Sequence, residues 1–401
     1  MSDSSDDVSL PSLAAASDGK LHGVATATGN SAKGHRMNPP SDSNRRSSPG
    51  LTCIEICAGA GGQALGLERA GFEHSVLVEL DDDAVRTLRA NRPHWDVLHA
   101  DVRGLSADRL RPDGQEQGIA LLAAGVPCPP FSLAGQQLGA ADERDLFPAV
   151  LELSARLKPR AVLIENVKGI LQAKFDSYRA DVLQQLEALG YVTSWRLLRA
   201  CDFGVPQLRP RAVLVAMRPA AFARFIWPMP TSCPDTAPTV GSVLYPSMAS
   251  QGWELARAWA DSATRIAPTL CGGSRKHGGA DLGPSRARRA WAELGVNGSS
   301  VADAPPRPGT LLPVKLTVAQ MALLQGFPSD WAITGRKTAA YRQVGNAFPP
   351  PVAAAVGRSI AMALIQTGSG SEDRNAQTGW LGSSASGTSR HVSVASPGVM
   401  A

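Results

Sequence analysis

Residues Thr52-Cys53-Ile54-Glu55-Ile56-Cys57 and the following Ala58-Gly59-Ala60-Gly61-Gly62-Gln63 decide the fold of this chain. The first six residues form a short apolar and β-branched run, which predicts a buried strand. The glycines predict a turn, and apolar residues at helical spacing from Leu65 to Ala70 predict a helix behind it. A glycine turn of this kind lets the backbone approach a ligand, and the helix N-terminus offers free N–H donors. The stretch therefore predicts the first βα unit of a nucleotide-binding sheet, although its G-x-G-G spacing differs from the dinucleotide pattern G-x-G-x-x-G.

Two acidic residues stand at the ends of the next two predicted strands. Glu79 ends the apolar run 75–79, and Asp101 ends the run 97–101. A carboxylate at Glu79 suits the two ribose hydroxyls of an adenosine, and Asp101 could accept the exocyclic amine of adenine. An alternative for Glu79 is a role at the start of the next helix, because the aspartates 81–83 follow it. Together the three strand ends predict an adenosine ligand that lacks a pyrophosphate.

A stiff loop that carries a cysteine follows a further apolar run, 119–124. Its sequence is Gly125-Val126-Pro127-Cys128-Pro129-Pro130-Phe131-Ser132. Prolines fix φ and remove N–H donors, so the segment is expected to be a loop rather than a helix start. Because α/β sheets place ligands at the carboxyl ends of their strands, Cys128 is a candidate nucleophile; the alternative is a buried, inert thiol. Glu165 lies near the end of the buried run 161–167, and an acid beside a nucleophile supplies acid–base chemistry.

Composition limits the cellular setting. The chain has 401 residues, a formal net charge of +5 and a pI of about 9.0, which favours an anionic partner. Its six cysteines form no C-x-x-C pair and its histidines lack zinc spacing, so we expect neither a structural metal nor a disulfide framework. The sequence shows no signal-peptide pattern and no apolar run of 18 residues, so we expect no membrane span. These features, with abundant Ala, Gly, Pro and Arg, predict a bacterial cytoplasmic protein.

Arginines occur at two further places. Arg209 and Arg211 lie two residues apart in a segment predicted to be extended, so their side chains should point the same way and could contact a phosphate or a base carbonyl. After residue 218 the composition shifts to Pro, Gly, Ser, Trp and Arg. Cations in this region that could enter a groove and reach base edges are Arg275, Lys276, Arg286 and Arg288. The alternatives are a solvated strand edge for the first pair and a solvated loop for the second group.

Taken in order, these motifs resemble those of the DNA (cytosine-5) methyltransferases, over about residues 51–218 and 314–366. Residues 58–62 resemble the cofactor loop, and Glu79 and Asp101 match the acids that bind ribose and adenine. The remaining matches are Pro127-Cys128 with Phe131-Ser132 for the nucleophile motif, Glu165-Asn166-Val167 for the acid motif, Gln207, Arg209 and Arg211 for Q-x-R-x-R, and Leu324-Gln325-Gly326-Phe327-Pro328 and Gln343-Val344-Gly345-Asn346 for the last two motifs.

The resemblance implies an α/β fold: a Rossmann-like, mostly parallel sheet of the S-adenosylmethionine-dependent methyltransferases, with a smaller, irregular target-recognition domain. It implies a catalytic and cofactor-binding domain at 51–218, a target-recognition domain at 219–337, and a C-terminal segment at 338–366 that returns to the catalytic domain. Residues 1–50 and 367–401 are expected to be disordered tails, because their composition cannot bury enough apolar surface.

The implied reaction is methyl transfer from S-adenosylmethionine to carbon 5 of a flipped-out cytosine in a specific duplex DNA site, through a covalent adduct on Cys128. The implied catalytic residues are Cys128, Glu165, Arg209 and Arg211. The implied cofactor-binding residues are Cys57, Gly59, Gly61, Gly62, Glu79, Leu80, Asp101, Val102, Pro127 and Asn346. The expected DNA contacts are Ser132, Arg275, Lys276, Arg286 and Arg288. We expect a nucleoid-associated monomer, with a restriction endonuclease that acts on the same site.

Some positions depart from the family pattern, and three other functions remain open from the sequence. Cys57 replaces a Phe, Leu80 an aromatic residue, Pro129 a Gln, and Ala319-Gln320 an Arg-Glu pair. One alternative is an RNA cytosine-5 methyltransferase of the same fold, against which the long basic stretch 219–313 argues. A second is a catalytically inactive DNA-binding regulator, against which the intact Cys128 and Glu165 argue. A nicotinamide oxidoreductase is the most distant, because its glycine pattern is absent.

Overall fold

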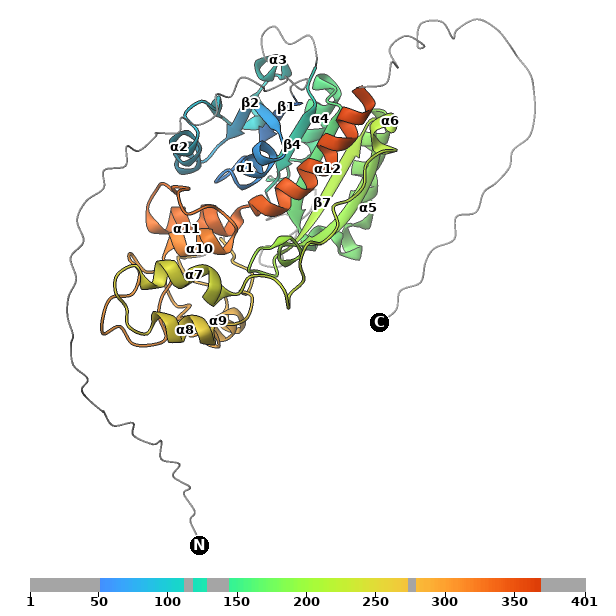
Figure 1. Cartoon of the computed structure of the whole chain (residues 1–401). Helices are drawn as coiled ribbons and strands as arrows, with labels where there is room; N and C mark the ends of the chain where they lie inside the picture. The colour runs from blue at the N-terminus through green and yellow to red at the C-terminus, as the bar shows by residue number, and fades with distance from the viewer. Residues whose placement is uncertain (1–50, 112–117, 128–143, 273–278, 369–401) are drawn as a thin grey trace, which may run out of the picture. The chain divides into compact units, whose positions relative to one another are not determined.

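A single seven-stranded sheet organises the chain in its computed structural model, which describes residues 51–111, 118–127, 144–272 and 279–368 (Figure 1). The strands lie in the order β3-β2-β1-β4-β5-β7-β6. Their bounds are β1 Leu51–Ile56, β2 Phe72–Glu79, β3 Val97–His99, β4 Leu121–Gly125, β5 Ala161–Val167, β6 Val192–Arg199 and β7 Pro210–Met217. The first five pair in parallel, and β7 is antiparallel to both of its neighbours. The predicted α/β fold with a mostly parallel sheet is confirmed.

Helices cover both faces of the sheet, as its continuous apolar strands require. On one face, α1 (Gly62–Arg69), α6 (Pro219–Phe222) and α12 (Pro350–Gly368) share a core with alternate residues of the central strands. On the other face, α3 (Ala107–Leu110), α4 (Phe147–Leu157) and α5 (Asp176–Ala188) close a second core. Short 3-10 turns connect some of these elements at η1 Val102–Gly104, η3 Lys168–Leu171, η4 Ala173–Phe175 and η5 Ala200–Phe203.

The turn from β1 into α1 has the conformation that its glycines predict. Gly61 adopts φ 80°, in the left-handed region, and is the residue that precedes the first helical position. At Gly62 a Cβ atom would lie 2.2 Å from the carbonyl oxygen of Phe348, in the segment that leads into α12. Any side chain at Gly62 would therefore push the C-terminal segment away from the turn.

The second half of the chain adds a helical body instead of a second sheet. Its helices are α7 (Val240–Ala249), α8 (Ala256–Ser262), α9 (Ser285–Ala292), α10 (Val318–Leu324) and α11 (Lys337–Asn346). In Figure 1, α10 and α11 lie between α7–α9 and the sheet, consistent with the contacts of α10 with α7 and of α11 with α2 (Asp82–Asn91). Buried tryptophans of this body belong to the same hydrophobic cluster as Ala60, Leu65 and Leu88. This helical body is therefore built directly onto the glycine-turn side of the sheet.

The last helix runs further than the sequence predicts. α12 ends at Gly368, and the Thr367 hydroxyl donates to the carbonyl of Ala363 inside the helix, so residues 367 and 368 are not part of a tail. The helical stretch 337–367 also has the length and hydropathy of a candidate membrane span, but 72% of its most apolar window is buried within the protein. Burial of this extent is typical of a core helix. The two predicted tails otherwise lie outside the described residues.

The crossing of α1 and α12 gives a stability prediction. A Cβ atom at Gly66 would lie 2.5 Å from the Cβ of Ala353 and 2.6 Å from the carbonyl oxygen of Pro350. Although alanine is the better helix former by about 1 kcal/mol, we expect Gly66→Ala to lower the free energy of unfolding by about 1–3 kcal/mol through overpacking. Urea unfolding is the measurement. Gly104→Ala, where a Cβ would meet nothing within 4 Å, is the control; equal midpoints for the two variants would contradict the close packing.

Candidate active site

A buried ion pair stands at the carboxyl edge of the sheet. In the β4–β5 register Gly125 lies beside Glu165, and the antiparallel β7 brings Arg211 beside Val167 on the same strand. Arg211 Nε lies 2.7 Å from Glu165 Oε1, and both side chains are less than 10% exposed. The contact is close but poorly directed: neither atom has a hydrogen-bond partner in the described part of the chain. The Glu165 carboxyl is therefore held at this edge mainly by ion pairing with Arg211.

The protonation of Glu165 follows from this environment. Burial raises the pKa of the Glu165 carboxyl, and the charges of Arg211 and Arg209 oppose the increase. The net shift is upward, so the carboxyl keeps its proton to a higher pH than an exposed glutamate does. A protonated carboxyl can donate a hydrogen bond to a substrate nitrogen, which an ionised carboxylate cannot do.

Arg209 has a different structural role from Arg211. Its backbone has φ 27°, so it is not extended and the expected parallel placement of the two arginines is wrong. Its fully buried guanidinium donates to three carbonyl oxygens, those of Leu270 at 2.6 Å and of Gly345 and Ala347 at 2.7 Å. Arg209 therefore joins the second half of the chain and the C-terminal segment to the start of β7, and its charge lowers the pKa of Glu165.

The glutamines of two motifs extend this connection. Gln207 donates to the side-chain oxygen of Gln325 at 2.7 Å and accepts the N–H of Leu270 at 2.8 Å. Gln325 in turn donates to the carbonyl of Val344 at 2.7 Å. Both glutamines are fully buried. Three motifs that are far apart in the sequence thus meet in one hydrogen-bond network, which positions the segment that carries Asn346.

The residues predicted to bind the cofactor gather around the glycine turn. Glu79 accepts N–H groups from Gly59 at 2.7 Å, Leu80 at 2.8 Å and Asp81 at 2.7 Å, so its carboxylate joins the end of β2 to the turn. Burial raises the pKa of the Cys57 thiol, and the charges of Glu79 and Asp101 raise it further; the Cys57 backbone has φ 55°. The helix-start role is taken by Asp81, which accepts the N–H groups of Asp83 and Ala84.

The carboxylates, the exposed Leu80 and the open space at this turn fit an adenosine. Among the described residues, none would lie within 4 Å of a Cβ atom at Gly59, so there is a cradle beside the turn. Leu80 is 58% exposed next to Glu79, which offers an apolar surface beside a hydrogen-bond acceptor. The Asp101 carboxylate is held by Arg103, whose side chain keeps the pKa of Asp101 below its usual value. Val102 is instead buried in the core behind this edge.

The remaining predicted site residues fall into three groups. Asn346 is exposed at the end of α11; a Cβ atom at Gly272 would lie 2.7 Å from its side-chain oxygen, and it precedes by two residues Phe348, whose carbonyl faces Gly62. Pro127 is half-buried at the end of a described segment. Arg286 and Arg288 lie exposed on α9. Four predicted residues lie outside the described residues: Cys128, Ser132, Arg275 and Lys276.

Sequence reasoning did not identify the residues that line the back of the glycine turn. Trp331 donates from its indole nitrogen to the carbonyl of Ala60 at 3.0 Å, and Phe327 approaches the position that a Cβ of Gly62 would occupy. Below the turn, Glu55 on β1 meets His74 at 3.2 Å, with both side chains buried. Glu55, an acid in the middle of an apolar strand, could have been recognised from the sequence. Trp331 lies in a loop, where no sequence pattern indicates its contact.

Comparisons with known proteins agree with this geometry. The sheet order, with antiparallel β7 and acids at the ends of β2 and β3, defines the class of S-adenosylmethionine-dependent methyltransferases. A sequence model described as C-5 cytosine-specific DNA methylase matches residues 51–362, and the chain belongs to this family. It is therefore a DNA cytosine-5 methyltransferase that uses S-adenosylmethionine, as the motifs predict. This decides against the RNA, inactive-regulator and nicotinamide alternatives.

Individual relatives are similar over most of the chain. The Type II methyltransferase M.NaeI of Lentzea aerocolonigenes is 56% identical over 323 residues, which cover 80% of this chain and 77% of the relative. M.NgoMIV of Neisseria gonorrhoeae is 47% identical and covers 78% of this chain and 98% of the relative. A solved structure described as a DNA modification methyltransferase from an Escherichia coli prophage is 23% identical, with a TM-score of 0.56 over 78% of this chain and 99% of that chain, and supports the fold.

The raised pKa of Glu165 leads to a prediction for the pH dependence of methyl transfer. If the protonated carboxyl is the active form, the single-turnover rate is highest below this pKa and falls as the pH rises through it. Glu165→Gln carries a neutral amide at every pH, so this alkaline limb should disappear, while the rate falls by about 10²–10⁴-fold. An unchanged alkaline limb in Glu165→Gln would show that another group titrates there.

Proposed function

We propose that this chain is the modification enzyme of a restriction–modification pair, and that it methylates a cytosine within a specific duplex site through a covalent bond to Cys128. The observation that carries the proposal is the buried Glu165–Arg211 pair beside Gly125. Cys128 follows Gly125 by three residues in the sequence and lies outside the described residues; the proposal is that it acts beside this pair. Because every group invoked belongs to one chain, the enzyme acts as a monomer, and its endonuclease is a separate protein of the same bacterial cytoplasm.

The chemistry of the described residues suits cytosine. The base must leave the helical stack before a thiolate can reach it. The sulfur of Cys128 bonds to carbon 6, and the electron pair of the 5,6 double bond moves into the ring while N3 takes the proton of Glu165. Arg211 holds the base carbonyl at the same edge. Carbon 5 is then nucleophilic enough to take the methyl group that bound S-adenosylmethionine supplies. Loss of the carbon 5 proton to water restores the double bond and expels the thiolate, and N3 returns its proton to Glu165.

The covalent step can be trapped. Fluorine at carbon 5 cannot leave as a cation, so DNA with 5-fluorocytosine at the target should form an adduct with the enzyme that survives a denaturing gel and requires S-adenosylmethionine. Cys128→Ala should give no adduct. Cys271→Ala, which removes an exposed free thiol, should trap as the unmodified enzyme does. An adduct that persists in Cys128→Ala, or maps by mass spectrometry to another cysteine, would contradict the assignment.

The target site is proposed from the relatives. A match over 80% of the chain necessarily includes residues 219–313, which lie outside the shared motifs and hold the exposed arginines of α9. The whole match is 56% identical, and we propose that this region reads the DNA site that M.NaeI modifies. Bisulfite sequencing of host DNA after expression should show modified cytosine at that site only.

Replacing Arg286 or Arg288 with alanine should either relax one base position, at a cost of about 1–3 kcal/mol, or weaken binding evenly. Modification at an unrelated site would refute the assignment.

A further inference from the structure

Trp331 supports the glycine turn from behind. Its indole nitrogen donates to the Ala60 carbonyl at 3.0 Å, and the indole is only 6% exposed. The six-membered ring also occupies the space beside Gly61, because a Cβ there would lie 2.9 Å from Trp331 Cζ2. The peptide between Ala60 and Gly61 is thus held both by a hydrogen bond and by contact with the ring. The cradle beside Gly59 begins one residue before this peptide.

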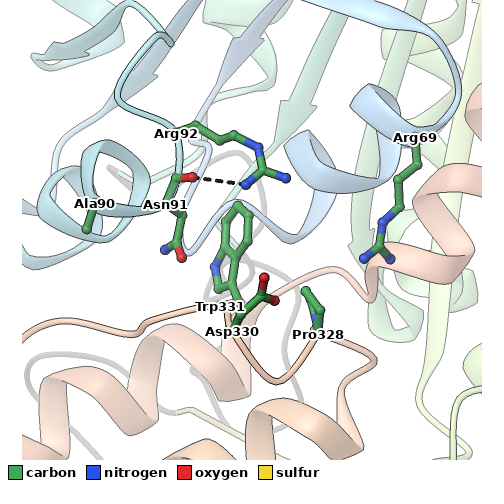
Figure 2. A pocket seen from close by; sticks show the side chains of 7 residues that line it. All are labelled: Arg69, Ala90, Asn91, Arg92, Pro328, Asp330 and Trp331. Atoms are coloured by element: carbon green, nitrogen blue, oxygen red, sulfur yellow. Dashed lines mark hydrogen bonds between the residues drawn. The ribbon is translucent and has the colours of Figure 1, made fainter. Parts of the chain in front are cut away.

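Other side chains hold the indole in place. Phe327 stacks on it with ring centroids 5.9 Å apart and an interplanar angle of 29°. The Arg92 guanidinium lies 5.1 Å from the ring centroid, and Arg92 is itself fixed by a bidentate contact with Glu68 on α1. Figure 2 shows Arg92 beside the ring, where both residues line a surface pocket of about 290 Å3. Cation–π contact and stacking leave the indole little freedom to rotate.

The residues after Trp331 are anchored to α2. Asn91 both donates to the Ala332 carbonyl at 2.7 Å and accepts its N–H at 2.9 Å. Thr334 donates to the carbonyl of Asp83 at 2.7 Å. Before Trp331, the chain comes from α10, which belongs to the helical body. Trp331 therefore lies on a segment with fixed ends, so the position of its indole is determined independently of the turn that it contacts.

We propose that Trp331 is a positioning residue for the cofactor: it holds the 58–62 turn in the shape that binds S-adenosylmethionine. Within the turn the Gly61 N–H donates to the Ala58 carbonyl at 3.0 Å, but Gly59 and Gly61, both at positive φ, have no side chains that would restrict the backbone to one conformation. On the opposite side Glu79 fixes the N–H of Gly59 at 2.7 Å. The Trp331 indole thus holds the turn at the Ala60 carbonyl and the Glu79 carboxylate holds it at the Gly59 N–H. Loss of either contact should lower the affinity for S-adenosylmethionine.

The test compares two tryptophan variants. Trp331→Phe keeps an aromatic ring against Phe327 and Arg92 but removes the hydrogen bond to Ala60. Trp253→Phe removes a matched indole hydrogen bond, to the Thr310 carbonyl at 2.8 Å, elsewhere in the same hydrophobic cluster. Calorimetry gives the Kd for S-adenosylmethionine, gel shift gives the Kd for duplex DNA, and thermal unfolding gives the stability. Glu79→Ala is the positive control for lost cofactor binding.

We expect Trp331→Phe to raise the Kd and KM for S-adenosylmethionine about 3- to 10-fold, the effect of one lost hydrogen bond. The kcat at saturating cofactor and the Kd for DNA should stay within about twofold of the unmodified enzyme, and Trp253→Phe should leave cofactor affinity unchanged. Unchanged cofactor affinity in Trp331→Phe would overturn the proposal. An equal loss of cofactor affinity in both variants, in step with their melting temperatures, would also overturn it, since it would show a structural role only.

Discussion

The burial of a carboxyl group beside two guanidinium groups is the constraint on which the catalytic end of this protein depends. A buried charge is costly unless it is paired, and breaking such a pair costs more than forming it gains. Glu165 is 4% exposed. The cost of burying it is offset by the direct contact with Arg211 and by the positive charges of Arg211 and Arg209. Arg211 can reach Glu165 because β7 runs antiparallel to β5. The reversed strand at this point of the sheet is therefore part of the site as well as of the fold.

The second guanidinium explains why the chain must return to the sheet. Arg209 has no exposed surface and donates to carbonyl groups from two later segments, one at Leu270 and one at the end of α11. Those carbonyls accept hydrogen bonds from a buried positive charge, so moving them away would leave the guanidinium unpaired and would destabilise the fold. Gly272 and Gly345 permit the approach, because a Cβ on Gly345 would lie 2.3 Å from the nitrogen of Gly272. The catalytic edge and the helical body are joined by the same buried arginine.

The sequence predicted what depends on local pattern. Apolar runs with Glu79, Asp101 and Glu165 at or near their ends predict buried strands with acids at one edge. Glu79 is the last residue of β2, Asp101 lies two residues beyond β3, and Glu165 lies two residues before the end of β5. The left-handed Arg209 could not be predicted, because a residue with a side chain adopts positive φ only where tertiary contacts hold it there. α7, α8 and α9 were missed because short helices in a Pro- and Gly-rich stretch owe their stability to packing rather than to propensity. The role of Trp331 could not be predicted either, because it rests on a hydrogen bond to Ala60, 271 positions away in the sequence.

Three buried carboxyl groups show how one fold assigns different roles to one residue type. Burial raises the pKa of Glu55, Glu79 and Glu165 alike. Glu79 is compensated by three backbone N–H groups, which bind its oxygens as acceptors and favour the ionised form. Glu55 is compensated by His74 and cannot be reached from solvent. Glu165 is paired with arginine side chains and lies beside Gly125 at the carboxyl edge of the sheet. Of the three carboxyl groups, Glu165 is thus the one at the strand end where we propose that the cytosine binds.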